Sequence, residues 1–301
     1  MTTTGQDMHV ARRKIIGGQH NGYRYQLAAK HDHQDTAQKL GDDLLSNIIT
    51  AIKHHPRSLQ KVIGPSEMGV ECSRAILHKL NQDTEPDRGV GWKPTIGTGV
   101  HAWLEDTFNS INGDPGNQQH GRWLCELKVN VGTVGGTPIW GSVDLFDMWT
   151  GTVIDWKIVG NSTLRKYRTE GPSQQYRAQA HLYGQGYANA GQKVNMVAIA
   201  FLPREGELTD SFIWTEPWSP QIAADTIARV DSLARLLAEV GIDQALAQFP
   251  PCTDRWCDWC GNRSGYGAPR PLPNFSAAPQ AQPSTHIPTL ADLVARENYS
   301  Q

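Results

Sequence analysis

The sequence lacks any apolar run approaching the roughly 20 residues that a membrane-spanning helix needs. Its first 14 residues also lack the apolar stretch of a secretory signal. We therefore expect a cytoplasmic protein that has no membrane partner.

Cysteine is scarce, with five residues in a chain of 301, and the number is odd. This is too sparse for a disulfide framework. Three of the five nevertheless fall within the nine residues 252–260. Clustered cysteines in a reducing compartment favour a metal site.

Strong charge is also missing, because the formal net charge is only -2. Composition alone therefore does not indicate a nucleic-acid-binding protein, and any such contact must use a local basic patch. The segment 165–168, with Arg177 nearby, is one candidate, although a solvated loop is the simpler interpretation. The motif GxxxxGK[ST] is absent, so this chain does not supply an ATP-driven motor of its own.

The hydrophobic pattern predicts an α+β fold, with helices and strands alternating in blocks. Turn residues at Gly135–Gly136 and Thr150–Gly151 join three strands into an antiparallel meander. Ser219 and Pro220 are a suitable N-cap and first residue for a long helix. Helices are expected over about 35–54, 70–80, 97–111, 173–190 and 220–247, and strands over 123–131, 139–148, 152–159, 194–202 and 208–215.

Composition divides the chain into three regions. Residues 1–60 are expected to be an N-terminal extension with one amphipathic helix. Residues 61–265 would form the core. Residues 266–301 are rich in Pro, Ala and Gln, which predicts a disordered tail.

Two carboxylates and one ammonium group stand out on the meander. Asp144 lies in GSVDL on the second strand, and Asp155 and Lys157 lie in VIDWK on the third. Residues two apart on a strand point to one face, so Asp155 and Lys157 should project together, with Asp144 beside them. Charge within an apolar strand is costly unless it is paired or bound to metal. Such carboxylates suit a hard divalent cation, and the lysine could orient an attacking water.

Two helices carry polar pairs at a spacing of four residues, which places each pair on one face. His101 and Glu105 form the first pair, and Gln179 and Tyr183 form the second. Taken singly, each is more simply explained as an ordinary surface or core residue.

Four segments in order, GTGVHAWLE, GSVDL, VIDWK and QAHLY, resemble the RecB-like branch of the PD-(D/E)xK nuclease superfamily. The family pattern is a helical His, then GxxD, (D/E)xK and QxxxY. Each motif alone is weak, but the ordered set covers about residues 64–262. The closest likeness is to CRISPR-associated and phage-encoded exonucleases that carry an iron–sulfur cluster. The resemblance implies a restriction-endonuclease-like core, with a central mixed sheet flanked by helices.

The resemblance also implies roles for the matched residues. His101, Asp144, Asp155 and the backbone carbonyl of Trp156 would ligate Mg²⁺ or Mn²⁺, and Lys157 would position the attacking water. Glu105 would support His101, and Gln179 and Tyr183 would orient Lys157 or the DNA strand.

The cysteines fit the same family. Cys125 lies inside the first strand and is expected to be a packed thiol. The family holds a [4Fe–4S] cluster with one cysteine before the catalytic histidine and three after the last core helix, which here match Cys72 and Cys252, Cys257 and Cys260. The trio departs from the family by having its longer gap first. Zinc also accepts four thiolates and is the competing metal.

The sequence therefore predicts a metal-dependent DNA exonuclease that serves phage or bacterial recombination, repair or replication, in the host cytoplasm if a phage encodes it. Recombination or replication proteins are expected partners. The alternative is a metal-stapled DNA-binding or recombination-partner module that cuts weakly or not at all. A third possibility is a nuclease that acts only inside a larger complex.

Overall fold

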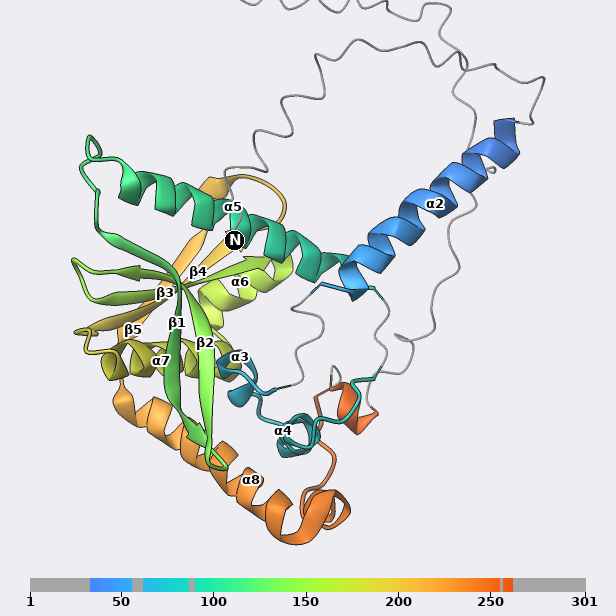
Figure 1. Ribbon diagram of the computed structural model, residues 1–301, viewed down its shortest axis with the longest axis vertical. Helices are drawn as coiled ribbons and strands as arrows, with labels where there is room; N and C mark the ends of the chain where they lie inside the picture. Colours follow the sequence, from blue (N-terminus) through green and yellow to red (C-terminus); the bar gives the residue numbers. More distant parts are fainter. Residues whose placement is uncertain (1–32, 56–61, 87–89, 255–256, 262–301) are drawn as a thin grey trace, which may run out of the picture. The chain divides into compact units, whose positions relative to one another are not determined.

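The computed structural model describes residues 33–55, 62–86, 90–254 and 257–261 (Figure 1). The chain divides into two compact units, residues 1–47 with 271–301, and residues 48–270. Helix α2, His33–Lys53, begins in the first unit and agrees with the expected amphipathic helix. The tail 266–301 lies outside the described residues, as does most of the extension 1–60.

The core is a five-stranded mixed sheet in the order β1-β2-β3-β4-β5. Strands β1 (Trp123–Val134), β2 (Thr137–Asp147) and β3 (Thr152–Val159) form the predicted antiparallel meander. Strand β4 (Met196–Pro203) pairs parallel with β3, and β5 (Phe212–Pro217) pairs antiparallel with β4. A parallel pair needs a long crossover, which is supplied here by two helices between β3 and β4.

Helices cover both faces of the sheet (Figure 1). Helix α5 (Trp92–Gly113) runs along one face, and α7 (Gln174–Asn189) and α8 (Pro220–Ala247) run along the other. The remaining helical elements are α3 (Pro65–Met68), α4 (Ser73–Leu80), α6 (Asn161–Glu170), η2 (Leu208–Asp210) and η3 (Asp258–Cys260). The α+β class and the flanked mixed sheet are thus confirmed.

Several sequence-based boundaries were wrong. The basic segment 165–168 belongs to helix α6 and not to a loop. This helix is held by Leu164, which is buried, and by Tyr167, whose ring lies 4.6 Å from that of Phe201. Residues 208–210 form a 3-10 turn, so the last strand starts only at Phe212. Helix α5 begins at Trp92, five residues earlier than expected.

Helix α8 begins where predicted, but the side chain of Ser219 does not cap it as expected. Pro220 occupies the first turn, yet the Ser219 side chain makes no capping hydrogen bond. The Ser219 amide donates instead to Nδ1 of His181 at 3.1 Å. None of the helices in the described ranges is both long enough and apolar enough to cross a membrane.

Candidate active site and cysteine cluster

The first half of the site lies where β2 and β3 separate. Their backbone pairing ends at Leu145 and Ile154. Beyond this point Asp144 Oδ2 accepts a hydrogen bond from the amide of Trp156 at 2.7 Å. A side-chain carboxylate thus takes the position that a backbone carbonyl would fill in a continuous ladder.

His101 on α5 completes this half. Its Nδ1 lies 3.3 Å from Asp144 Oδ1, and its Nε2 lies 3.1 Å from the carbonyl oxygen of Trp156. The side chains of His101 and Asp144 are 15% and 10% exposed, so both are reachable from solvent but held in place. The imidazole, the carboxylate and the carbonyl proposed as metal ligands therefore lie together.

The second half of the site faces α7. Lys157 Nζ lies 2.5 Å from Asp155 Oδ2 and 4.8 Å from the centre of the Tyr176 ring. Gln179 Nε2 donates to Asp155 Oδ1 at 3.1 Å and to the Tyr183 hydroxyl at 3.1 Å. Each of the predicted residues Asp155, Lys157, Gln179 and Tyr183 is therefore joined to another of them by a short contact.

Burial raises the pKa of the Asp155 carboxyl to about 6, with Lys157 opposing the shift and Asp144 adding to it. The side chain is only 2% exposed. A carboxylate kept in a poorly solvated position beside a cation is typical of functional sites, although structural ion pairs also show it.

The two halves of the site meet at consecutive residues of β3. Asp155 belongs to the second half, and the backbone amide and carbonyl of Trp156 belong to the first half. Asp144 and His101 both influence the charge of Asp155 electrostatically. Glu105 does not join either half by a hydrogen bond among the described residues, and it affects Cys125 on β1 instead. Its expected support of His101 stays a prediction.

Gly141 is the glycine of the GxxD segment, and close packing around it explains why this position has no side chain. A Cβ atom at this position would lie 2.7 Å from Pro65 Cγ and 2.8 Å from Tyr183 Cε1. Contacts this short do not occur in real structures. The absence of a side chain on β2 therefore lets the α7 tyrosine approach the sheet.

A buried network fixes α7 on the side away from the site. His181 is fully buried, and because its Nδ1 accepts from the Ser219 amide, its Nε2 donates to Glu216 Oε1 at 2.6 Å. Arg177 binds the same carboxylate through two nitrogens at 2.6 and 3.0 Å. Arg177 is therefore engaged in structure, and the sequence-based idea that it extends a basic patch is not favoured.

Sequence reasoning missed Glu126 on β1. The ligand atoms of His101, Glu126 and Asp144 all lie within 4.8 Å of one another. Glu126 also has a positive φ of 48°, which is uncommon outside glycine. The alternation of side chains along a strand does not predict such a backbone conformation.

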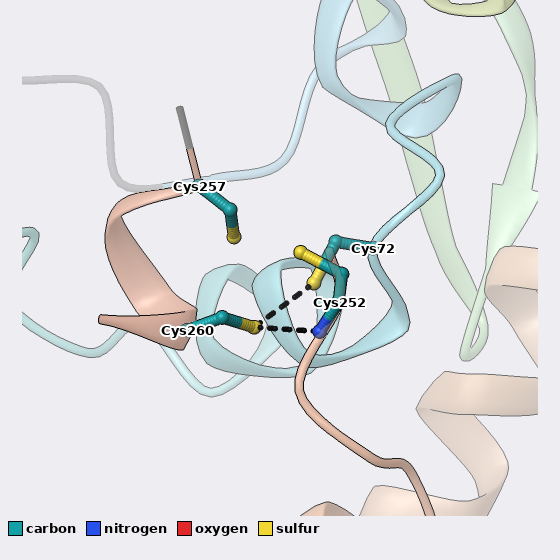
Figure 2. A group of neighbouring side chains, drawn as sticks. All are labelled: Cys72, Cys252, Cys257 and Cys260. Atoms are coloured by element: carbon teal, nitrogen blue, oxygen red, sulfur yellow. Dashed lines mark hydrogen bonds between the residues drawn. The ribbon is translucent and has the colours of Figure 1, made fainter. Parts of the chain in front are cut away.

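The four cysteines expected to share a metal gather at one point, and their sulfur atoms point toward a common centre (Figure 2). Ligand atoms of Cys72, Cys252, Cys257 and Cys260 lie within 4.8 Å of one another. Cys72 Sγ and Cys260 Sγ are 3.6 Å apart, and Cys260 Sγ accepts from the Cys252 amide at 3.3 Å. Four thiols gathered at this spacing suit a tetrathiolate metal site.

Contacts within the polypeptide bring Cys72 close to the segment that precedes Cys252. Cys72 caps α4, with its sulfur accepting from the Ala75 amide at 3.4 Å. Two residues later, Arg74 Nη1 donates to the carbonyls of Leu246 and Phe249 at 2.8 and 3.1 Å, at the end of α8. The segment that leads to Cys252 is therefore anchored beside Cys72.

Cys125 stands apart from this cluster, as expected. It is partly buried on β1. Burial raises the pKa of its thiol to about 11, and Glu105 and Glu126 add to the effect. A thiol so rarely ionised is a poor nucleophile.

No protein-family model matches the chain, and no curated protein matches it. Among solved structures, an alkaline exonuclease from Laribacter hongkongensis is similar at 13% identity and a TM-score of 0.42, covering 67% of this chain and 97% of that one. The structure of that exonuclease in complex with dAMP gives 15% identity and a TM-score of 0.42, covering 62% and 93%. A candidate exonuclease from Eubacterium rectale gives 15% and 0.40, covering 75% and 97%. These likenesses are distant, so the site is interpreted from this chain's own residues.

Proposed function

We propose that this protein is a divalent-metal-dependent deoxyribonuclease of the PD-(D/E)xK type. The observation that carries the proposal is the convergence of His101, Asp144 and the Trp156 carbonyl on one side of β3 with Asp155 and Lys157 beside them. These residues come from α5, β2 and β3, and the stability of the sheet does not require these residue types at these positions.

The spacing of the ligands suits a six-coordinate ion. Neighbouring ligands about 2.1 Å from such an ion lie roughly 3.0 Å apart. His101 Nδ1 and Asp144 Oδ1 are 3.3 Å apart, which is close to this value, while the Trp156 carbonyl lies 3.1 Å from the other ring nitrogen, Nε2. Oxygen ligands favour Mg²⁺ or Mn²⁺. A bound ion would polarise the scissile phosphate and stabilise the charge that develops during hydrolysis.

The chain's own residues would orient the reactants. Lys157 has the position to direct an attacking water, because its ammonium is held between Asp155 and the Tyr176 ring. Gln179 holds the other oxygen of Asp155 and the hydroxyl of Tyr183, so it fixes the angle of the carboxylate. Positioning of this kind accounts for a large part of catalysis in phosphoryl transfer.

We propose a structural role for the cysteine site. A metal group held by Cys72 and the trio would close a very long loop and convert binding free energy into folding free energy. The family resemblance favours a [4Fe–4S] cluster. The 3.6 Å separation of Cys72 and Cys260 supports the zinc alternative, because a single ion with Zn–S bonds of about 2.3 Å sets its thiolates roughly 3.8 Å apart. In a cubane each thiolate binds a different iron, which requires a wider spread.

The proposed organisation keeps both sites in a core of residues 61–265, with the regions 1–60 and 266–301 outside it. Exonuclease action on DNA ends, in phage or bacterial recombination, repair or replication, is the role that the resemblance supports. The alternative is a DNA-binding module that cuts weakly or not at all. The complete set of Asp144, Asp155 and Lys157 speaks against that alternative.

Digestion of linear DNA labelled at either the 5′ or the 3′ end separates these functions. A metal-dependent exonuclease should release labelled mononucleotides or short products with Mn²⁺ or Mg²⁺ and none with EDTA. Binding without product, at protein in excess over DNA, would favour the non-cleaving module. A circular substrate of the same sequence serves as the control for dependence on ends.

A further inference from the structure

The inference concerns Glu126 and rests on the proposed function, since it adds a ligand to the same metal site. Glu126 comes from β1, a strand that contributes nothing to the motifs recognised in the sequence. Its carboxylate lies with the imidazole of His101 and the carboxylate of Asp144, all ligand atoms within 4.8 Å of one another. Three elements, α5, β1 and β2, thus bring one nitrogen and two carboxylates to one point.

The backbone explains how Glu126 reaches this point. Cys125 pairs with Leu145 and Leu127 pairs with Val143, so Glu126 stands opposite Asp144 in the register of β1 and β2. Its φ of 48° interrupts the regular alternation of side chains along the strand. Such backbone conformations persist only where the surroundings enforce them, and they are concentrated at functional sites.

Electrostatics supports a ligand role over a packing role. Two partly buried carboxylates that lie this close favour the binding of a cation between them. Glu126 and Asp144 are both only partly exposed, which limits screening by solvent. A purely structural residue at a position of positive φ would more naturally be glycine or asparagine.

We propose that Glu126 is a ligand of the catalytic divalent ion, together with His101 and Asp144. Asp155, the further ligand that the resemblance implies, also contacts Lys157 and Gln179. A ligand set with one imidazole nitrogen also suits Mn²⁺ better than Mg²⁺, because Mg²⁺ prefers oxygen ligands more strictly.

Measuring Mn²⁺ binding in the absence of DNA tests whether Glu126 is a ligand, and this measurement does not depend on nuclease activity. The free ion is followed by electron paramagnetic resonance during titration of the wild type, Glu126→Gln, Asp144→Asn and Asp106→Asn. Asp106 is an exposed acid on α5 and is the charge-matched control. Glu126→Gly is added because glycine accepts the positive φ, so that variant folds even if glutamine strains the strand.

The proposal predicts that Glu126→Gln and Glu126→Gly each weaken Mn²⁺ binding at least tenfold, as Asp144→Asn does, while Asp106→Asn binds like the wild type. The melting temperatures of Glu126→Gln and the wild type are measured without metal as the reference. Added Mn²⁺ should raise the melting temperature of Glu126→Gln less than that of the wild type.

Wild-type affinity in both Glu126 variants, with binding lost in Asp144→Asn, would overturn this inference and leave the proposed nuclease site standing. Absence of Mn²⁺ binding in the wild type itself would overturn both.

Discussion

Cys72 Sγ lies 3.6 Å from Cys260 Sγ, although 188 residues separate them in the chain. The first cysteine caps helix α4 and the second ends the turn η3. The core strands and helices lie between them in sequence, so a metal bound here would fasten the two ends of the core.

Cys72→Ser should remove the bound metal and lower the melting temperature by about 10 °C, because three thiolates hold a metal poorly and its binding supports the fold. Metal content by elemental analysis and thermal unfolding of the same anaerobic preparation provide the measurement. Cys125→Ser is the matched control and should keep both metal and stability. Equal metal content in Cys72→Ser and wild type would show that the cluster is not a metal site. Iron or zinc in the wild type decides which group it holds.

Cys125 should resist alkylation in the folded protein. With a thiol pKa of about 11, only roughly one molecule in a thousand carries the thiolate at pH 8. Iodoacetamide treatment of native, metal-loaded protein followed by mass spectrometry should find Cys125 unmodified, whereas treatment after unfolding should modify it fully. Rapid modification in the native protein would contradict both the raised pKa and the packed position.

Gly141→Ala should destabilise the core by about 1–3 kcal/mol, because the new methyl group would press on Pro65 and Tyr183. Cleavage should fall as well, since Tyr183 is joined to Asp155 through Gln179. Gly99→Ala is the control, because this helical glycine on α5 has open space around it. It should be neutral or more stable by up to about 1 kcal/mol. Urea unfolding of both variants gives the comparison, and equal stability of the two would contradict the packing account.

Asp147 should make stability sensitive to acid. Burial alone would raise the pKa of its carboxyl, but hydrogen bonds from Arg122, Thr150 and the Trp149 amide outweigh it and hold the pKa below the ordinary value of 3.8. A lowered folded-state pKa contributes stability that is present above pH 3.8 and is lost as the pH falls through the folded value.

Asp147→Asn should therefore unfold more easily at pH 7 but lose less stability than the wild type as the pH is lowered below about 4. Urea unfolding at a series of pH values provides the measurement, with the exposed Asp106→Asn as control. If the free energies of unfolding of Asp147→Asn and the wild type change with pH in the same way, Asp147 does not contribute this pH-dependent stability.

Much of the fold could be predicted from the sequence, and several residues predicted for the site lie close together in the structure. Hydrophobic alternation marked the strands of the meander, and the four ordered motifs named His101, Asp144, Asp155 and Gln179. These residues follow regular elements whose direction is set by the periods of helix and strand. The family resemblance implied a mixed sheet, but the parallel pairing of β3 with β4 was not predicted and appears only in the structure.

What could not be predicted depends on tertiary contacts or irregular backbone. Helix α6 has a polar sequence and is stabilised by Tyr167 against Phe201, a contact between distant segments. Glu126 lies opposite Asp144 because Cys125 pairs with Leu145 and Leu127 with Val143, a register that the sequence does not specify. The role of Arg177 in binding Glu216 likewise appears only when α7 packs on β5. These features cannot be predicted from local sequence patterns.

The central claim is that Lys157 and the acidic residues beside it catalyse metal-dependent cleavage of DNA. Single-turnover cleavage of end-labelled linear DNA by Lys157→Gln, with Mn²⁺ binding measured on the same sample, tests it most directly. The account predicts that the variant remains folded and binds Mn²⁺ and DNA, but cleaves at least about a hundredfold more slowly than the wild type, because the attacking water is no longer positioned. Cleavage by Lys157→Gln at the wild-type rate would contradict the account.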